Sequence, residues 1–185
     1  MPFNQSKIKF DSSKYDSFFD FMFEGINVKR DVVVISDCDG VLTDSKAVYN
    51  KNGKVFKTYG AYDKEAMKYL EEKFGWSFNF VTVDTKGDGF KITSKRISDL
   101  GHFVSEVNAK ERVEHIKKFK ESGKTVIYIG DSISDIPALS EADYSGCPKN
   151  APWQISAYVD YISEFDGGNG AFADIILELA QVIND

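Results

Sequence analysis

The sequence predicts an α/β fold of three layers, in which helices cover both faces of a central parallel sheet, and three observations indicate it. Short apolar runs rich in β-branched residues alternate with amphipathic segments along most of the chain. Several of the amphipathic segments end at a glycine, as helices often do. The length of 185 residues suits one core, so we expect a single domain over residues 1–185.

Each expected element follows from its local pattern. Three apolar runs have the composition of buried strands, namely 31–36, 78–83 and 125–130. Weaker strands are expected at 102–107, near Tyr144 and at 158–162. Apolar residues at helical spacing predict helices at 63–74, 91–100, 110–122, 135–142 and 171–182. Strands joined by helices in this way pair in parallel through right-handed crossovers.

Two segments depart from the alternation. A β-hairpin is expected at 46–60, because Asn52-Gly53 is a turn-forming pair between two alternating stretches. This hairpin directly follows the first strand and is too small to form a cap domain. Residues 1–27 contain a cluster of phenylalanines and are expected to form a helical extension that packs on the domain.

Composition excludes several classes of protein. The net charge of −6 argues against a broad nucleic-acid-binding face, and no apolar run is long enough to cross a bilayer. The N-terminal stretch lacks the uninterrupted apolar core of a secretory signal. Cys38 and Cys147 have no metal-ligand spacing and form no disulfide framework, so a reducing cytoplasm is the expected location.

Polar side chains follow three of the expected strands at the point where each strand ends. Asp37 and Asp39 follow the first strand, Thr82 lies at the end of the second, and Asp131 follows the third, with Asp135 four residues later. Ligands of open α/β sheets bind at this edge. Carboxylates brought together raise one another's pKa, and a divalent cation removes the conflict. Oxygen ligands with room for water favour Mg²⁺.

Carboxylates around a magnesium ion indicate phosphate chemistry, because the ion screens the charge of the phosphate. Asp37 can attack phosphorus to form an aspartyl-phosphate. Asp39 can protonate the leaving oxygen and later deprotonate the attacking water. Gly40 leaves the backbone free to approach the phosphoryl oxygens.

Two stretches then resemble motifs of the haloacid dehalogenase superfamily of phosphatases. "DCDGVLTD" resembles its motif I and "YIGDSISDIPAL" its motif IV, while Thr82 and Lys110 fall where its motif II Thr/Ser and motif III Lys belong. The resemblance implies a Rossmann-like fold. It also implies a Mg²⁺ ion held by the Asp37 carboxylate, the Asp39 backbone carbonyl and the Asp131 carboxylate.

The resemblance also implies a role for each remaining motif residue. Thr82 would hydrogen-bond the transferring phosphoryl group, and Lys110 would balance the charge of nucleophile and phosphate. Asp135 would orient the metal shell or Lys110.

The hairpin, the missing cap and the tail "GGNGAFADIILEL" are similar to a capless branch, the 3-deoxy-manno-octulosonate 8-phosphate phosphatases. That resemblance implies a homotetramer in which the hairpins assemble and a neighbouring subunit covers the site. It also implies as substrate the phosphomonoester of an eight- or nine-carbon acidic sugar.

Three stretches depart from that branch where it handles its sugar acid. Its motif II usually reads T-G-R, whereas Val83 and Asp84 stand here in the last two places. Its tail usually reads G-G-R-G, whereas Asn169 replaces the arginine, and Tyr62 replaces the arginine before the first expected helix. Arginine binds carboxylates bidentately. We therefore expect an altered pocket for the leaving group, with Asn169 among the residues that bind the substrate.

The insert at 84–91 leaves two questions open. One of its lysines or the next one, Lys86, Lys91 or Lys95, could supply the missing positive charge, or the insert could be a solvated loop. Thr85 is an alternative to Thr82 as the phosphate-binding residue, although the alternation of "FNFVTV" favours Thr82.

The leading hypothesis is a cytoplasmic, Mg²⁺-dependent phosphatase for a small phosphorylated metabolite, in particular a sugar phosphate. One alternative is a phosphatase for another phosphomonoester, such as a nucleotide or a nucleic-acid end. A further alternative is a catalytically silent module that keeps the fold and assembles through its hairpin.

Overall fold

The structure is a computed structural model that describes residues 11–25, 30–84 and 87–184. Its elements, in chain order, are α1 (Phe18–Met22), β1 (Val32–Asp37), β2 (Thr43–Asn50), β3 (Gly53–Tyr59), α2 (Asp63–Phe74), β4 (Ser77–Thr82), α3 (Asp88–Asp99), β5 (Val104–Glu106), α4 (Ala109–Glu121), β6 (Thr125–Ile129), the 3₁₀ helix η1 (Ile133–Asp135), α5 (Ile136–Glu141), β7 (Tyr144–Cys147), the 3₁₀ helix η2 (Trp153–Tyr158), β8 (Tyr161–Ile162) and α6 (Ala171–Asn184).

The main sheet has six strands in the order β5-β4-β1-β6-β7-β8, and every neighbouring pair is parallel. The strand order reverses direction at β1, because β4 lies on one side of it and β6 on the other. The carboxyl ends of β1, β4 and β6 therefore border the switch point at which ligands of such sheets bind.

Alternating side chains of the strands build two cores, one on each face of the sheet. Val32 and Val34 of β1 belong to the core shared with α2 and α6, together with Phe80 of β4. Val33 and Ile35 of β1 point to the other face, where they meet α4 and α5. Because both faces are covered, β1 is apolar at consecutive positions and completely buried, as a central parallel strand should be.

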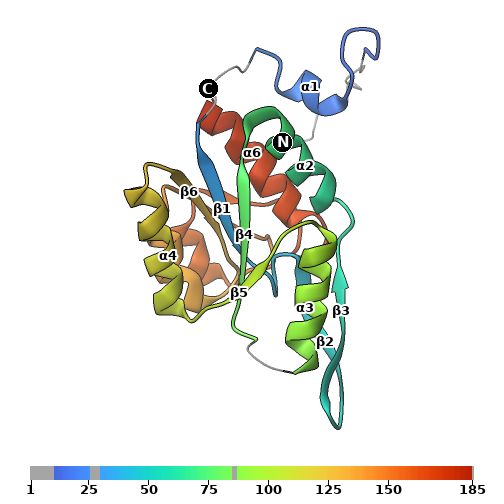
Figure 1. The fold of residues 1–185 in the computed structure, drawn as a ribbon, viewed down its shortest axis with the longest axis vertical. Helices are drawn as coiled ribbons and strands as arrows, with labels where there is room; N and C mark the ends of the chain where they lie inside the picture. The colour runs from blue at the N-terminus through green and yellow to red at the C-terminus, as the bar shows by residue number, and fades with distance from the viewer. Residues whose placement is uncertain (1–10, 26–29, 85–86, 185) are drawn as a thin grey trace.

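Figure 1 shows the sheet edge-on, with α2 and α6 on one side of it and α4 on the other. The hairpin β2–β3 projects beyond the sheet at its carboxyl end and runs beside α3. At the opposite end, α1 lies on α2, where the ring of Phe19 stacks on Tyr69 at 4.9 Å between centroids.

The three-layer fold and the hairpin after the first strand are confirmed, and the differences are local. The hairpin begins at Thr43, because the chain enters β2 directly from the turn after β1. Helix α3 begins at Asp88, three residues earlier than the pattern predicts. The 3₁₀ helix η2 has no counterpart among the expected elements.

The expected extension over 1–27 lies partly outside the described residues, and within them it contains the short helix α1. Its Phe23 belongs to the core beside α2. Across the described parts of the chain, every helix is too short or too polar to cross a bilayer.

Candidate active site

Strands β1 and β6 bring the carboxylates of Asp37 and Asp131 together. In β1 and β6, Ser36 is paired with Ile129, so Asp37 and Asp131 leave adjacent strands at the same edge. The turn after β1 passes directly over Asp131. A Cβ atom placed on Gly40 would lie 1.8 Å from Oδ2 of Asp131, and Gly40 also has a φ of +94°. Only glycine therefore allows this contact between the two loops.

Asp135 joins the same cluster from η1. Its Oδ2 accepts hydrogen bonds from the backbone N–H and the hydroxyl of Ser132, at 3.0 and 2.7 Å. Its Oδ1 accepts a hydrogen bond from the Tyr128 hydroxyl at 2.7 Å. Suitably placed oxygens of Asp37, Asp131 and Asp135 all lie within 4.8 Å of one another. Protein donors already hydrogen-bond both carboxylate oxygens of Asp135. This residue is therefore suited to orienting the carboxylates of Asp37 and Asp131.

A guanidinium group lies beside the three carboxylates. Arg112 on α4 is 1 % exposed, and its Nη1 donates to Oδ2 of Asp37 at 3.2 Å and to the Tyr128 hydroxyl at 3.0 Å. The same nitrogen donates to Oδ1 of Asp135. Helix α4 is fixed at its start by a capping box of Asn108 and Glu111. The box sets the first turn, which points Arg112 toward the sheet.

The structure corrects the prediction that Lys110 lies at the phosphate site. The Lys110 side chain is 86 % exposed, and its ammonium lies 3.8 Å from Glu114 on the surface of α4. Arg112 takes the place expected for the motif III lysine. The two positions are two residues apart, and on a helix such positions do not share a face.

The cluster has more negative than positive charge within it. Burial raises the pKa of Asp37 to about 7, against the opposing effect of Arg112, and the carboxylates of Asp135 and Asp131 add to the rise. Burial also raises the pKa of Asp131 to about 6, assisted by Asp135. Within the described residues Asp131 has no ion pair, and the Ser45 hydroxyl donates to it at 3.2 Å. A cation at this point would relieve both carboxylates.

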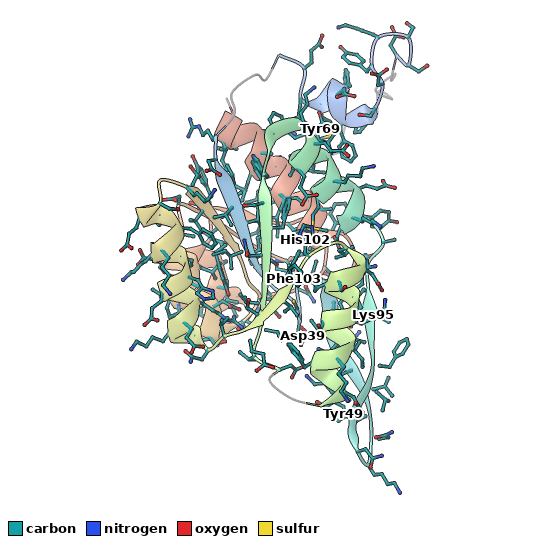
Figure 2. All side chains as sticks on the ribbon, viewed as in Figure 1. Asp39, Tyr49, Tyr69, Lys95, His102 and Phe103 are labelled. Atoms are coloured by element: carbon teal, nitrogen blue, oxygen red, sulfur yellow. The ribbon has the colours of Figure 1, made fainter. Side chains whose placement is uncertain are left out.

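Asp39 belongs to a separate group of charges on the other side of the turn. The ammonium of Lys57, from β3, donates to Oδ2 of Asp39 at 2.8 Å, to Asp84 at 2.9 Å and to the Thr93 hydroxyl at 2.9 Å. The Lys57 side chain is 1 % exposed, whereas that of Asp39 is 31 % exposed. The Asp39 carboxylate can therefore reach solvent and substrate, while the buried Lys57 ammonium fixes its position. Figure 2 shows Asp39 beyond the end of β4, beside α3.

Thr82 ends β4 beside Asp37, because Val81 is the residue paired with Asp37 in the sheet. It is completely buried, and its Oγ1 accepts the backbone N–H of Asp84 at 3.2 Å. Thr82 therefore lies at the edge where Asp37 lies. The alternative Thr85 falls outside the described residues, as does Lys86.

The glycine-rich tail "GGNG" packs against the turn after β1. The backbone N–H of Gly168 donates to the carbonyl of Val41 at 2.9 Å. A Cβ atom on Gly167 would lie 1.8 Å from the carbonyl oxygen of Gly40. The tail thus fixes the turn that carries Asp39. Asn169 is exposed beside it, and its backbone N–H donates to Asp166 at 3.0 Å.

Among the described residues, Lys91 and Lys95 do not supply charge to the site. Lys91 pairs with Asp88 at 3.1 Å and Lys95 with Asp99, and both lysine side chains are about three quarters exposed, at 75 % and 73 %. Figure 2 shows Lys95 on the outer surface of α3. The buried positive charges come instead from Arg112 and Lys57, neither of which was predicted from the sequence.

The sequence pattern does indicate that Arg112 and Lys57 lie on buried faces. Arg112 precedes the buried Ile116 by one helical turn, so it lies on the buried face of α4. Lys57 alternates with the exposed Phe56 and Thr58 in β3, which places it on the inner face of the hairpin. A lysine or arginine on a buried face needs a carboxylate partner, and that requirement could have identified them.

The donor set fits a hard divalent cation better than zinc. All the candidate ligands are oxygens, and within the described residues the cluster contains neither histidine nor cysteine. Cys38, between Asp37 and Asp39, is completely buried, and burial raises the pKa of its thiol well above the ordinary value. Its thiol is therefore a poor ligand in this position.

Comparison with known proteins places this geometry in a family. The family described as haloacid dehalogenase-like hydrolase matches residues 36–175. The 3-deoxy-D-manno-octulosonate 8-phosphate phosphatase KdsC of Haemophilus influenzae is 30 % identical over 152 residues, which cover 78 % of this chain and 82 % of that protein. The Copper-transporting ATPase 2 of Rhizobium meliloti is 37 % identical over 120 residues, 65 % of this chain but 14 % of the transporter.

Solved structures show the same fold. The cobalt-bound octulosonate-phosphate phosphatase of Haemophilus influenzae has a TM-score of 0.67 and 29 % identity, and the match covers 79 % of this chain and 86 % of that one. The enzyme of Moraxella catarrhalis, a complex with magnesium ion, phosphate ion and KDO, has a TM-score of 0.68 at 24 % identity, with 85 % and 88 % of the two chains covered. The chain therefore belongs to the haloacid dehalogenase-like hydrolases and is a phosphatase of that family.

Proposed function

We propose that this phosphatase is a Mg²⁺-dependent phosphomonoesterase that hydrolyses a small phosphorylated metabolite, in particular a sugar phosphate, through an aspartyl-phosphate on Asp37. One observation carries the proposal. Asp37 and Asp131 meet from two adjacent strands, and Asp131 has no ion-pair partner among the described residues. A pair of carboxylates in that state is suited to a metal ion, and a metal ion beside a nucleophilic carboxylate is suited to phosphoryl transfer.

The metal ligands in this proposal are the carboxylates of Asp37 and Asp131 and the backbone carbonyl of Asp39, with Asp135 as the orienting residue. When bound, Mg²⁺ neutralises charge on the phosphate and on Asp37. The cation also favours the ionised form of Asp37, whose pKa burial otherwise raises to about 7. The nucleophile is thereby anionic at neutral pH.

The side chains of the site can divide the reaction into two balanced steps. An oxygen of Asp37 forms a bond to phosphorus while the bond from phosphorus to the leaving oxygen breaks, and Asp39 gives that oxygen a proton. In the second step Asp39 takes a proton from water as the water oxygen attacks phosphorus, which releases phosphate and restores Asp37. The backbone N–H of Cys38 holds Oδ1 of Asp37 at 2.8 Å and Arg112 holds Oδ2, which fixes the attacking carboxylate.

Four further residues would act on the phosphoryl group or on the leaving group. Arg112 contributes a permanent positive charge next to Asp37, where negative charge accumulates in the transition state. Thr82 would donate its hydroxyl to a phosphoryl oxygen, and Gly40 would leave the backbone N–H groups of the turn accessible to it. Asn169 would contact the leaving group from the tail, beside the turn that carries Asp39.

The names of the relatives indicate the class of substrate. The Haemophilus influenzae phosphatase acts, by its name, on the 8-phosphate of an octulosonate sugar. We propose a related sugar phosphate, similar to octulosonate or nonulosonate phosphates, bound in an altered leaving-group pocket. Asp84, Asn169 and Tyr62 stand where arginines are usual in that branch, and this substitution supports the alteration.

The test is the release of phosphate from an aryl phosphate with Mg²⁺ or with a chelator. We expect turnover that requires Mg²⁺ and that Asp37→Asn abolishes, while Asp88→Asn, an exposed residue of α3, keeps it. A panel of sugar phosphates and nucleoside monophosphates then identifies the preferred leaving group. If turnover is independent of metal, or if the Asp37→Asn enzyme equals the unsubstituted one, the catalytic proposal is wrong and a silent module becomes the better account.

We also propose that the chain assembles as a homotetramer through its hairpin. Four large apolar side chains of β2 and β3 are between 42 % and 63 % exposed, namely Val48, Tyr49, Val55 and Phe56. Tyr49 points from the hairpin into solvent (Figure 2). An open site also benefits from a neighbouring subunit that excludes water. The two free, buried cysteines support a reducing cytoplasm as the location.

A further inference from the structure

We propose that Asp84 is a specificity-determining residue, and that it directs the site toward phosphates whose leaving group is uncharged and rich in hydroxyls rather than anionic. This inference rests on the proposed function and narrows its substrate class to sugar phosphates that lack the carboxylate of the octulosonate and nonulosonate sugars. It is carried by an ion-pair cluster of two lysines and two aspartates beside the catalytic turn: Asp39, Lys54, Lys57 and Asp84.

Asp84 is the residue that binds both lysines. Its Oδ1 and Oδ2 accept from Lys54 at 2.8 and 2.6 Å, and its Oδ2 also accepts from Lys57 at 2.9 Å. The same Lys57 ammonium donates to Asp39 at 2.8 Å. A single ammonium group therefore separates Asp84 from the residue that would protonate the leaving oxygen.

This position places Asp84 against the leaving group. If Asp39 protonates the leaving oxygen, the rest of the leaving group must extend past Asp39. Lys57 is too deeply buried to meet it, with 1 % of its side chain exposed. Lys54 and Asp84 are 24 % and 22 % exposed, so the part of the cluster that solvent and substrate can reach consists of one ammonium and one carboxylate in contact.

Three parts of the fold fix the ion-pair cluster in place. Lys54 and Lys57 come from β3, Asp84 follows β4, and α3 closes the cluster with its first turn. A Cβ atom on Gly89 of α3 would lie 2.9 Å from Cδ of Lys54 and 3.1 Å from Oδ2 of Asp84. The absence of a side chain at Gly89 thus lets the helix approach the ion pair and keep it in place.

The charges of the cluster decide which leaving group it accepts. Two ammonium groups and two carboxylates balance, so the cluster offers no net attraction to a carboxylate on the substrate. An anionic leaving group would have to displace Asp84 from Lys54 or lie next to the Asp84 carboxylate. The first breaks an ion pair and the second places like charges together, so either costs free energy. A sugar hydroxyl can donate to Asp84 and accept from Lys54 without breaking the pair.

The experiment compares two phosphates that share a six-carbon chain, glucose 6-phosphate with a neutral leaving group and 6-phosphogluconate with an anionic one. We expect a higher kcat/KM for glucose 6-phosphate with the unsubstituted enzyme. Asp84→Asn keeps the size of the side chain but frees the charge of Lys54. We expect it to shift the ratio of kcat/KM values toward 6-phosphogluconate by about tenfold, mainly through KM.

The matched control is Asp88→Asn, which removes an exposed carboxylate of α3 that pairs only with Lys91 among the described residues, and it should leave the ratio unchanged. Lys54→Gln gives an independent measurement, because Asp84 then keeps only Lys57 as a partner and should lower kcat/KM for 6-phosphogluconate further. If both variants still hydrolyse the aryl phosphate but neither changes the ratio of kcat/KM values, this inference is wrong and the proposed function stands. Absence of aryl phosphate turnover in the unsubstituted enzyme overturns the proposed function and this inference with it.

Discussion

Arg112 is the residue on which the charge balance of the site depends. It is buried against Asp37 and Asp135, and the Tyr128 hydroxyl accepts from Arg112 and donates to Asp135. Burial disfavours its charge, but these carboxylates raise the pKa of the guanidinium above its ordinary value, so it is permanently ionised.

Replacing Arg112 with methionine should therefore affect both folding and catalysis. We expect a loss of about 3–5 kcal/mol in the free energy of unfolding, because a buried charge pair loses one partner. We also expect kcat to fall by about a hundredfold or more, as the nucleophile and the phosphoryl group lose their fixed positive charge. Denaturant unfolding and phosphate release measure the two effects.

Lys110→Met is the control, since that ammonium lies on the surface of the same helix. It should change the free energy of unfolding by less than about 0.5 kcal/mol and leave kcat unchanged. A severe loss of activity in Lys110→Met together with a mild effect in Arg112→Met would restore the original assignment of Lys110.

The raised pKa values of Asp37 and Asp131 predict how stability depends on pH without metal. In the folded chain these groups titrate near pH 7 and pH 6, above their values in the unfolded chain. The folded state therefore holds protons more tightly, so their contribution to stability is complete at low pH and is lost as the pH rises through about 6 to 7. In the proposed function Mg²⁺ would bind the ionised carboxylates and should reverse that loss.

We expect Mg²⁺ to raise Tm more at pH 7.5 than at pH 5, because protons compete with the ion at the lower pH. Thermal unfolding at both values, with Mg²⁺ and with a chelator, measures the difference. Asp131→Asn should remove most of the response to Mg²⁺ at pH 7.5. An equal response of Asp131→Asn and the unsubstituted chain would mean that the ion binds elsewhere.

At the scale of elements, α4 is the helix that delivers Arg112, and its capping box fixes where it begins. The Asn108 side chain accepts the N–H groups of Lys110 and Glu111, at 3.0 and 3.1 Å, while the Glu111 carboxylate accepts the N–H of Asn108 at 2.8 Å. Three donors that would otherwise lack partners at the start of the helix are thereby satisfied.

Removal of this cap should destabilise the domain. Asn108→Ala is expected to lower the free energy of unfolding by about 1 kcal/mol, the usual cost of a lost N-cap. Lys118→Ala, at an exposed position of the same helix, controls for helix propensity and should be close to neutral. Denaturant unfolding measures the free energy of unfolding of both variants. Equal values for the two would show that the cap does not stabilise this helix.

Patterns of elements were more predictable than the partners of single residues. The apolar runs of β1, β4 and β6 are buried on both faces, so composition alone identified them, and the Asp residues after β1 and β6 followed from the rule for sheet edges. The η2 helix was missed because its residues carry no sustained helical period. Arg112 and Lys57 were missed because their importance lies in carboxylates distant in the sequence, and local pattern does not encode those contacts.

At the scale of the whole molecule, the hairpin leaves apolar surface that the domain itself does not cover. Val48 and Phe56 face each other across β2 and β3, and both are more than half exposed, at 56 % and 57 %. Exposed apolar residues gathered on one projecting element are typical of interfaces between subunits. A tetramer would bury them and bring a second chain near each site.

The mass of the assembly in solution tests this expectation. We expect a tetramer by sedimentation, and a shift to smaller species in the double variant Val48→Ser and Phe56→Ser, since the apolar area that holds the subunits together is reduced. Exposed Val182 of α6, changed to serine, is the control and should leave the mass unchanged. An unsubstituted chain that sediments as a monomer would contradict the assembly.

The identity of the nucleophile is the central claim, and trapping the phosphoryl group tests it most directly. An aryl phosphate has a good leaving group, so Asp39→Ala should still allow Asp37 to be phosphorylated, whereas hydrolysis of the product needs Asp39 as a base. The measurement is peptide mass spectrometry of Asp39→Ala quenched in acid after mixing with aryl phosphate and Mg²⁺. The account predicts one added phosphoryl group on Asp37. Release of the aryl alcohol with Asp37 unmodified throughout, or a phosphoryl group on another residue, would contradict it.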